Sequence, residues 1–195
     1  MPKTNRSGQA AIVPSAQLDA IMQKLSEIDP LFRCVFSVCR YTACRVSESL
    51  GLKWENIATD AVVIPKVITK KKMKTREIPL NPKLGAEMQE WWRAWAKVFE
   101  REPGGCDYVF PDRRDVTKHV LRRAADHALR KACTELGLTG VSTHSFRRSA
   151  LTAASDAGVP LRVIQTISGH SSLEMLQRYL DVKDEAKRKA ALTFG

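Results

Sequence analysis

Apolar residues recur at helical spacing in the N-terminal part of the chain. Residues 14–27, "PSAQLDAIMQKLSE", predict a first helix with Ser15 as its N-cap. Its apolar face holds Leu18, Ile21, Met22 and Leu25. A more apolar helix is predicted from Pro30, which suits a first helical turn, and a short helix in "RVSESLGLKW" ends at Gly51.

The pattern changes to β-branched residues in the middle of the chain. The stretches "AVVIPKVIT" and "TREIPL" read as strands whose prolines suit strand edges or ends. The basic run "KKKMK" joins them. A small antiparallel β-element is therefore predicted, with this run at its tip.

Helical periodicity returns after this element. "NPKLGAEMQEWWRAWAKVFE" and "VTKHVLRRAADHALRKACTELGL" each predict one continuous helix, the second closing near Gly137. Ser142 or Thr143 can cap a further helix that ends at Gly158, and "LRVIQTIS" forms another that stops at Gly169. Ser171 and Glu174 then form a possible capping box for a last helix. The predicted fold class is mainly α with a small antiparallel β-sheet (α+β).

Length and composition indicate one main folded domain. The chain has 195 residues, of which 44% are hydrophobic and 27% charged. We expect a flexible lead-in over residues 1–14, a domain over 15–183 and a tail over 184–195. No segment suits a membrane span or an export signal, so a cytoplasmic protein is expected.

The five cysteines do not predict a metal or disulfide site. Cys34, Cys39 and Cys44 recur every fifth residue, a spacing that rotates each one about 140° from the last on a helix. We therefore expect reduced, buried thiols.

The charge favours a polyanionic partner. A formal net charge of +11 and a pI of about 9.7 oppose self-association and suit nucleic acid. The basic run fits such a partner, although it equally fits a solvated hairpin tip.

The stretch "STHSFRR" predicts an anion site at a helix N-terminus. His144 falls in the first turn, and Arg147 and Arg148 lie three and four residues on, so either arginine can share its face. The alternative is a capping histidine beside two solvated arginines.

Other positions have both chemical and structural interpretations. Arg45 and Glu48 are three residues apart, which suits an ion pair that orients the guanidinium, or a plain surface pair. His170 sits in a bend nine residues before Tyr179, so both can border one pocket, although Tyr179 also suits core packing. Another alternative is a DNA-reading helix-turn-helix over residues 153–168. The spacing of its small residue, turn glycine and two core aliphatic residues is matched by Ala154, Gly158, Ile164 and Ile167.

Five segments in order resemble the catalytic domain of the tyrosine recombinases, which include the phage integrases and Xer-type recombinases. They are "TACRVSESLGL", a lysine in the basic hairpin before "REIPL", "HSFRR", "SGH" and a tyrosine nine residues beyond that histidine. The resemblance covers roughly residues 15–183.

The resemblance implies a role for each matching position. Arg45 looks like the first phosphate-clamping arginine, and Glu48 like its supporting acid. His144 and Arg147 look like the His-x-x-Arg pair, which decides against Arg148, and Tyr179 looks like the nucleophile. His170 resembles the following histidine. Lys71 is the preferred catalytic lysine over Lys70, and further DNA contacts are expected from Lys70, Lys72, Lys74 and Arg148.

The sequence departs from the family pattern at three places. A Gly-Leu pair usually precedes the first arginine and here is Ala43-Cys44, Ser168 replaces the usual Leu before Gly-His, and Arg148 stands where His is frequent. None of these departures removes a catalytic group.

The implied reaction is site-specific recombination of double-stranded DNA, as in integration and excision, through a 3′-phosphotyrosyl intermediate. No cofactor or metal is expected, because the sequence has no acidic cluster for Mg²⁺ and no Gly-rich phosphate loop. The resemblance also implies a homotetramer on DNA and a monomer when free, with the tail docking on a neighbouring protomer. A type IB topoisomerase or a helix-turn-helix regulator remains the alternative, and the missing N-terminal clamp domain predicts weak, salt-dependent DNA binding.

Overall fold

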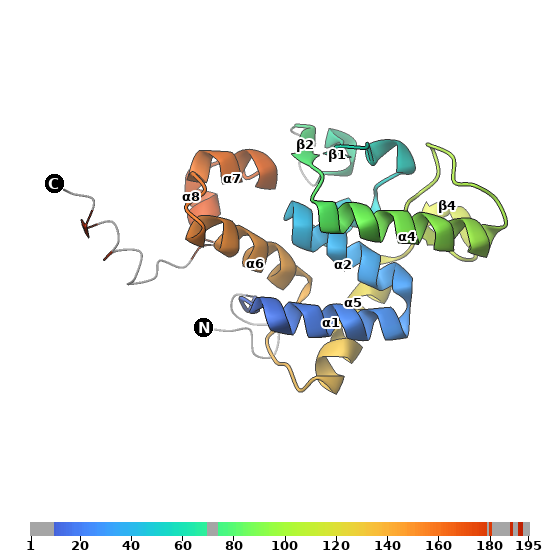
Figure 1. Cartoon of the computed structure of the whole chain (residues 1–195), viewed down its shortest axis with the longest axis horizontal. Coiled ribbons are helices and arrows are strands. Elements are labelled where there is room, and N and C mark those ends of the chain that lie inside the picture. Colours follow the sequence, from blue (N-terminus) through green and yellow to red (C-terminus); the bar gives the residue numbers. More distant parts are fainter. Residues whose placement is uncertain (1–9, 70–73, 179, 181–187, 189–190, 193–195) are drawn as a thin grey trace.

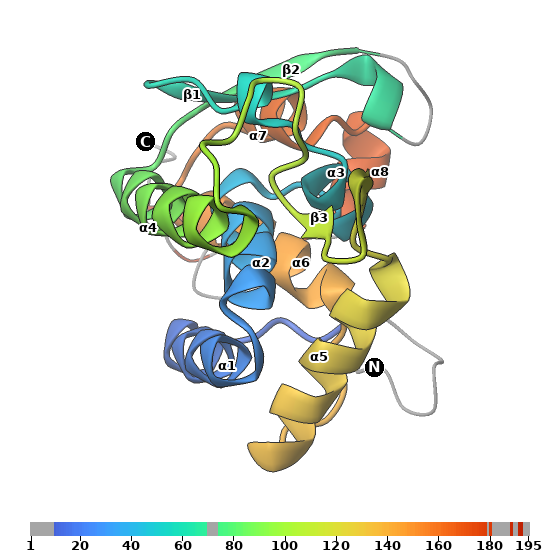
Figure 2. The same cartoon turned by 90° about the vertical axis from the view of Figure 1, so that its right-hand side faces the viewer.

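One helix, α2, forms the centre of the computed structural model, which describes residues 10–69, 74–178, 180, 188 and 191–192. α2 (Pro30–Thr42) contacts α1 (Ser15–Ile28), α3 (Val46–Leu50), α4 (Pro82–Phe99), α5 (Arg122–Glu135) and α6 (Thr143–Asp156). Figures 1 and 2 show α2 between α1 and α4, with α6 beside it.

The central position of α2 follows from its sequence. Val35, Phe36, Val38 and Cys39 are all fully buried, as expected for a helix that is apolar on most of its sides. The ring of Phe36 lies 4.8 Å from that of Phe146, which joins α2 to α6. Pro30 occupies the predicted first turn. The predicted burial of three free thiols is confirmed for Cys34, Cys39 and Cys44.

The predicted small antiparallel sheet is confirmed. β1 (Ala61–Ile64) pairs with β2 (Arg76–Pro79) in a register that sets Ala61 opposite Pro79 and Ile64 opposite Arg76. Two 3₁₀ turns flank β1: η1 (Trp54–Asn56) before it and η2 (Lys66–Ile68) after it. The sheet lies at one edge of the domain, above α4 in Figure 1.

The single long helix predicted for residues 116–138 is wrong at its start. β3 (Pro111–Asp112) and β4 (Asp115–His119) form a second antiparallel pair, and α5 begins only at Arg122. The β-branched pair Val116-Thr117 suits a strand, and β4 pairs with β3 in a register that sets Pro111 opposite His119. The predicted end near Gly137 is confirmed, because this glycine has a φ of 65°.

The C-terminal helices surround a second, smaller apolar cluster. α6, α7 (Leu161–Ser168) and α8 (Leu173–Gln177) contribute to it, and Figure 1 shows them together at one end of the domain. The buried members of the cluster are Ala43, Leu151, Ile164 and Leu176. The turns predicted at Gly158 and Gly169 are confirmed by φ values of 79° and 69°.

Two predicted caps are displaced by one residue. Pro14, not Ser15, is the N-cap of α1, and the Ser15 hydroxyl accepts a hydrogen bond from Arg40 instead. Ser172, not Ser171, caps α8 by accepting from the Met175 N–H at 3.2 Å. Arg40 of α2 thus competes for the Ser15 hydroxyl, whereas the Ser171 hydroxyl donates to Met175 Sδ within α8 at 3.0 Å.

The segment before α1 packs on α6, which differs from the flexible lead-in expected there. Val13 is buried, and its N–H donates to the Ser149 hydroxyl at 2.8 Å. Ala11 N–H donates to the Gly140 carbonyl at 3.2 Å. Residues 10–14 therefore belong to the packed body.

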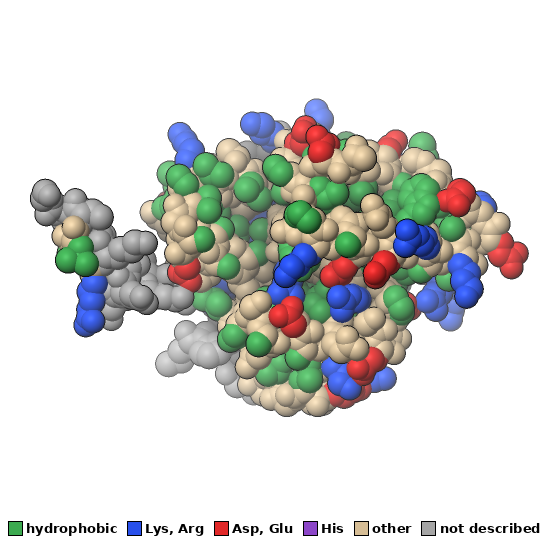
Figure 3. Space-filling model, in the orientation of Figure 1, with side chains coloured by type: hydrophobic (Ala, Val, Ile, Leu, Met, Phe, Trp, Pro, Cys, Tyr) green, Lys and Arg blue, Asp and Glu red, His purple; other side chains and the backbone are tan. Residues whose placement is uncertain are grey.

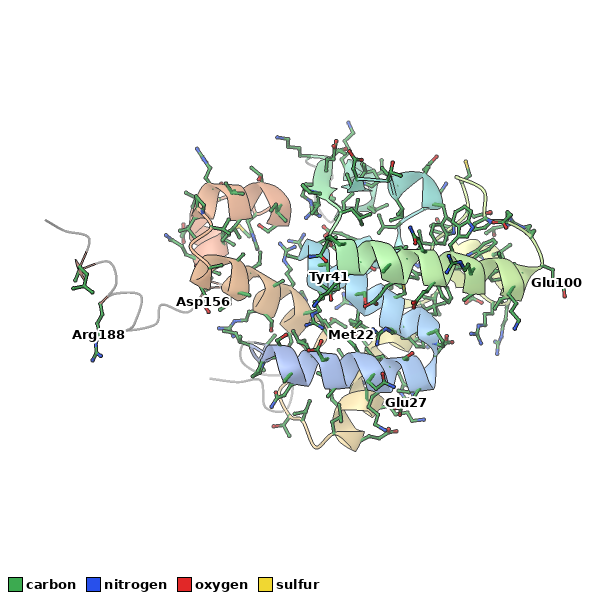
Figure 4. The ribbon with its side chains drawn as sticks, viewed as in Figure 1. Met22, Glu27, Tyr41, Glu100, Asp156 and Arg188 are labelled. Atoms are coloured by element: carbon green, nitrogen blue, oxygen red, sulfur yellow. The ribbon has the colours of Figure 1, made fainter. Side chains whose placement is uncertain are left out.

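The surface carries both signs of charge. The face seen in Figure 3 mixes Lys and Arg with Asp and Glu, so the positive excess is not gathered on that face. Figure 4 labels two positions on α1 that show its two sides: Met22 is buried in the core and Glu27 is exposed. No helix within the described part of the chain has the length and apolarity needed to cross a bilayer.

Candidate active site

A cleft of about 1030 Å³ gathers side chains from five separate segments. The segments are the start of α3, the strand β2 with the residues before it, the starts of α5 and α6, and the bend between α7 and α8. The cleft lining includes the predicted site residues Arg45, Glu48, Lys74, His144 and His170. Predicted site residues up to 125 positions apart in the sequence, from Arg45 to His170, thus border one space.

Arg45 and Glu48 form the predicted ion pair. Arg45 is the N-cap of α3, and its Nη1 lies 3.0 Å from Glu48 Oε1, while its backbone N–H donates to Glu48 Oε2 at 2.9 Å. The Arg45 side chain is 26% exposed, whereas that of Glu48 is 1% exposed. The carboxylate therefore holds the guanidinium at the cleft wall, which excludes the alternative of a plain surface pair.

Arg76 also lines the cleft, which the sequence did not predict. Its Nη2 lies 2.7 Å from Glu48 Oε2, and its Nη1 donates to the carbonyls of Ile167 at 2.9 Å and Ser168 at 3.0 Å. Arg76 thus ties β2 to α3 and to the end of α7. The one sequence signal was an arginine at the start of "REIPL", on the same side of the strand as the buried Ile78.

Two arginines keep Glu48 ionised. Burial alone would raise the pKa of Glu48, but the charges of Arg76 and Arg45 and the hydrogen bonds that these residues donate outweigh it. The pKa of Glu48 therefore lies below its ordinary value. The buried carboxylate remains an anion that can orient both guanidinium groups.

Arg147 lies directly behind the cleft wall. It is 1% exposed, and its Nη1 donates to the Ala43 carbonyl at 2.6 Å, while Nη2 lies 2.8 Å from the Ser168 carbonyl and 3.2 Å from His170 Nε2. These contacts join the ends of α2 and α7 to α6. Ala43 has a φ of 51°, a left-handed conformation that turns its carbonyl toward Arg147 at the position where the family pattern has Gly.

His170 is held between Ser168 and Arg147. Its Nδ1 lies 2.8 Å from the Ser168 hydroxyl, and its carbonyl accepts from Gln165 Nε2 at 3.1 Å. Burial, followed by the charges of Arg147, Arg45 and Arg76, lowers the pKa of His170 to about 3. The imidazole is therefore neutral at physiological pH.

His144 lines the cleft from the first turn of α6 and is partly buried. The turn is supported by the Ser142 N–H, which donates to the Ser145 hydroxyl at 3.0 Å. This location agrees with the predicted anion site at a helix N-terminus.

Arg148 lies away from the cleft, contrary to the prediction of a DNA contact. It is 8% exposed, and its Nη1 donates to the Ala10 carbonyl at 2.6 Å. Arg148 therefore helps to fix the segment before α1 on α6. Consecutive residues on a helix point about 100° apart, so Arg147 and Arg148 serve different sides of α6.

The predicted nucleophile and most of the basic run lie outside the described residues. These are Lys70, Lys71, Lys72 and Tyr179. Lys74 is exposed and lines the cleft, and Leu180, directly after the tyrosine, packs on the C-terminal apolar cluster. Among the described residues no group of three His, Cys, Asp or Glu side chains is arranged to hold a metal ion.

The chain is similar in sequence to known recombinases. The model of the phage integrase family matches residues 12–186. The tyrosine recombinase XerD of Mycobacterium leprae (strain TN) is 29% identical over 161 residues, which cover 80% of this chain and 50% of that protein. The chain thus spans about half the length of this relative.

Solved structures share the fold at low identity. The XerA recombinase superposes with a TM-score of 0.76 and 20% identity, over 94% of this chain and 65% of that one. The XerH site-specific recombinase bound to its difH substrate, before cleavage, superposes with a TM-score of 0.74 and 16% identity. The match covers 98% of this chain and 56% of that one. A lambda integrase tetramer bound to a Holliday junction superposes with a TM-score of 0.67 and 16% identity. The match covers 90% of this chain and 49% of that one.

These likenesses confirm the predicted fold, a helical tyrosine recombinase catalytic domain with small antiparallel sheets. The family model covers most of the chain, including the segments that carry Arg45, His144, Arg147 and His170. The chain belongs to the phage integrase family.

Proposed function

We propose that this chain is the catalytic domain of a site-specific tyrosine recombinase that cuts and rejoins double-stranded DNA. The phenolic oxygen of Tyr179 attacks a backbone phosphorus while its proton passes to a nearby histidine. The bond from phosphorus to the 5′ oxygen breaks, and a 3′-phosphotyrosyl linkage forms. The observation that carries this proposal is the gathering of Arg45, Glu48, His144 and His170 on one cleft, with Arg147 directly behind it.

The arginines would stabilise the negative charge that develops in this reaction. A phenol with a pKa near 10 is almost wholly protonated at neutral pH, and the pentacoordinate transition state carries extra negative charge. Guanidinium groups present a planar fork of donors to nonbridging oxygens, which a lysine ammonium cannot do. Arg45 at the cleft wall and Arg147 behind His170 would supply these donors.

The leaving oxygen needs a proton, and we assign that proton to Lys71 in the basic segment. Lys70, Lys72 and Lys74 would contact the DNA backbone nearby, as the exposed position of Lys74 at the cleft supports. In the second step a 5′-hydroxyl attacks the phosphotyrosine and the phenol leaves. The phosphodiester energy is conserved in the intermediate, so neither a metal nor a nucleotide is required.

We propose that the protein acts in the cytoplasm as a homotetramer on DNA and is a monomer when free. The DNA complex of XerH and the lambda integrase tetramer on a Holliday junction support this assembly by their shared fold. Docking of residues 184–195 on a neighbouring protomer belongs to the same proposal. Most of this tail lies outside the described residues, but Leu192 is 88% exposed and is thus an accessible apolar contact.

A covalent capture experiment tests the proposal and does not require the DNA site to be identified first. The chain is incubated with a random-sequence pool of nicked DNA duplexes, whose short cleavage product diffuses away and prevents rejoining. Wild type should give a protein–DNA adduct that survives denaturing electrophoresis. Tyr179→Phe should abolish the adduct, while Tyr108→Phe, which lies outside the cleft lining, should retain it.

The same variants separate the alternatives. An adduct that persists in Tyr179→Phe would defeat the proposal, and relaxation of supercoiled DNA without site preference would favour a topoisomerase. A helix-turn-helix regulator would bind a specific sequence with no covalent product, and Arg45→Ala would leave that binding intact. A recombinase should lose cleavage far more than binding in Arg45→Ala.

A further inference from the structure

We infer that Ser168 is a positioning residue, whose hydroxyl orients His170 so that His170 in turn orients Arg147. The inference rests on the proposed function, because it concerns a phosphate-binding arginine of that reaction. It extends the site to a side chain that does not line the cleft and is fully buried.

The three groups form a continuous chain of hydrogen bonds. The Ser168 hydroxyl lies 2.8 Å from His170 Nδ1, and His170 Nε2 lies 3.2 Å from Arg147 Nη2. All three residues are at most 5% exposed. Buried polar groups need partners, so each contact constrains the next side chain.

The direction of each hydrogen bond follows from the chemistry of the groups. A guanidinium can only donate, so His170 Nε2 must offer its lone pair to Arg147. The ring proton of a neutral imidazole then lies on Nδ1 and points to the Ser168 oxygen. The Ser168 hydroxyl proton is in turn directed to the Gln165 carbonyl at 3.3 Å. Each hydrogen in this chain thus has an acceptor.

The neutral state of His170 is consistent with its surroundings. Arg147, Arg45 and Arg76 place positive charge around the ring, and the negative charge of Glu48 offsets them only in part. A protonated ring would carry hydrogens on both nitrogens and oppose the Arg147 donor. The hydroxyl of Ser168 therefore supports the acceptor form of His170 that Arg147 needs.

The backbone of Ser168 has a separate role, which allows a clean test. Its carbonyl accepts from both Arg147 Nη2 and Arg76 Nη1, and side-chain substitution leaves this carbonyl in place. If the Ser168 side chain merely fills space, Ser168→Ala should leave the tautomer and hydrogen bonding of His170 unchanged. If its hydroxyl positions His170, Ser168→Ala should change them.

The test combines side-chain nitrogen NMR of His170 in the DNA-free chain with single-turnover adduct formation on the nicked duplexes. Wild type should show the Nδ1–H tautomer with a proton protected from exchange. Ser168→Ala should lose this protection and form the adduct at least about tenfold more slowly at unchanged DNA affinity. Ser168→Thr should retain both properties, and Ser168→Cys, a weaker acceptor of similar size, should fall between them.

Ser155→Ala on α6 serves as the matched removal of a hydroxyl outside the network, with no change expected in either measurement. An Nε2–H or doubly protonated His170 in the wild type would overturn the inference, as would a Ser168→Ala protein with wild-type spectra and rate. Failure of the wild type to form any adduct would instead defeat the proposed function, and with it the contribution of Ser168 to that reaction. The NMR measurement decides the hydrogen-bond chain in either case.

Discussion

Arg76 and Glu48 form an ion pair in the interior, with Arg76 Nη2 2.7 Å from Glu48 Oε2 and side chains that are 5% and 1% exposed. The same carboxylate also binds Arg45 at the cleft wall. Because Arg76 also binds the Ile167 and Ser168 carbonyls, one guanidinium couples the sheet, the first arginine segment and the histidine bend. The geometry of the proposed phosphate-binding site thus depends on a residue that does not itself need to touch DNA.

Removal of Arg76 should destabilise the domain strongly. Arg76→Ala leaves the Glu48 carboxylate with one fewer buried partner and frees two carbonyls, which costs about 3–5 kcal/mol. Arg76→Lys keeps the charge but cannot bond to all three acceptors, so it should lose less. Urea unfolding measures both variants. Arg101→Ala, which breaks an exposed ion pair with Asp107, is the control and should change the midpoint far less.

Gly169→Ala should damage the domain more than Gly158→Ala. Both glycines are left-handed, so alanine is strained by about 1–2 kcal/mol at either site. At Gly169 the added Cβ would also lie 2.8 Å from Arg76 Cδ, whereas at Gly158 no described atom lies within 4 Å. Thermal unfolding and adduct formation should both separate the pair. Equal losses of stability and adduct formation in the two variants would show that the close contact of the added Cβ with Arg76 has no effect.

The stability of the domain should fall in mild acid because of His170. The unfolded chain takes up a proton near the ordinary pKa of 6.5, whereas folded His170 does so only near a pKa of about 3, so stability decreases as pH falls through this range. His170→Asn should flatten the dependence between about pH 7 and about pH 5. Glu48 loses its stabilising charge only at lower pH, because its pKa is lowered.

Urea unfolding at several pH values measures that slope. His127→Asn, on the exposed side of α5, should retain the wild-type slope. A slope that is the same in His170→Asn and the wild type would contradict burial of a neutral imidazole.

Binding of DNA by this chain should be weak and strongly dependent on salt, with Lys74 contributing one phosphate contact. Loss of one contact lowers the slope of log affinity against log salt by about 0.9. Lys74→Ala should show this change in fluorescence anisotropy with duplex DNA. Lys24→Ala, on α1 at the opposite side from the β1–β2 hairpin, should leave the slope unchanged. Tight, salt-insensitive binding by the wild type would count against the account.

Features set by local sequence were predictable. Helical periodicity located α1, α2 and α4, and glycines marked the ends of α6 and α7, because these signals act within a few residues. The β4 strand was missed because apolar spacing in residues 116–121 could be extended into the helix that follows. The pairing of β4 with β3, which apolar spacing does not reveal, accounts for the strand.

Roles that depend on distant contacts were harder to predict. Arg45 and Glu48 were found because their partner lies three residues away, whereas Arg76 binds carbonyls more than ninety positions along the chain. Arg147 and Arg148 are adjacent in sequence and alike in chemistry, and only the packing of α6 assigns one to the site and the other to the segment before α1.

The proposed reaction requires the phenol of Tyr179 to become covalently bound to DNA. Trypsin cleavage after Arg178 and Lys183 releases residues 179–183, a peptide with a single tyrosine, so mass spectrometry of the captured adduct can locate the linkage. The proposed reaction places a nucleotide phosphate on this peptide, and the Tyr179→Phe protein should lack it. A nucleotide phosphate on any other residue, or an adduct undiminished in Tyr179→Phe, would contradict it.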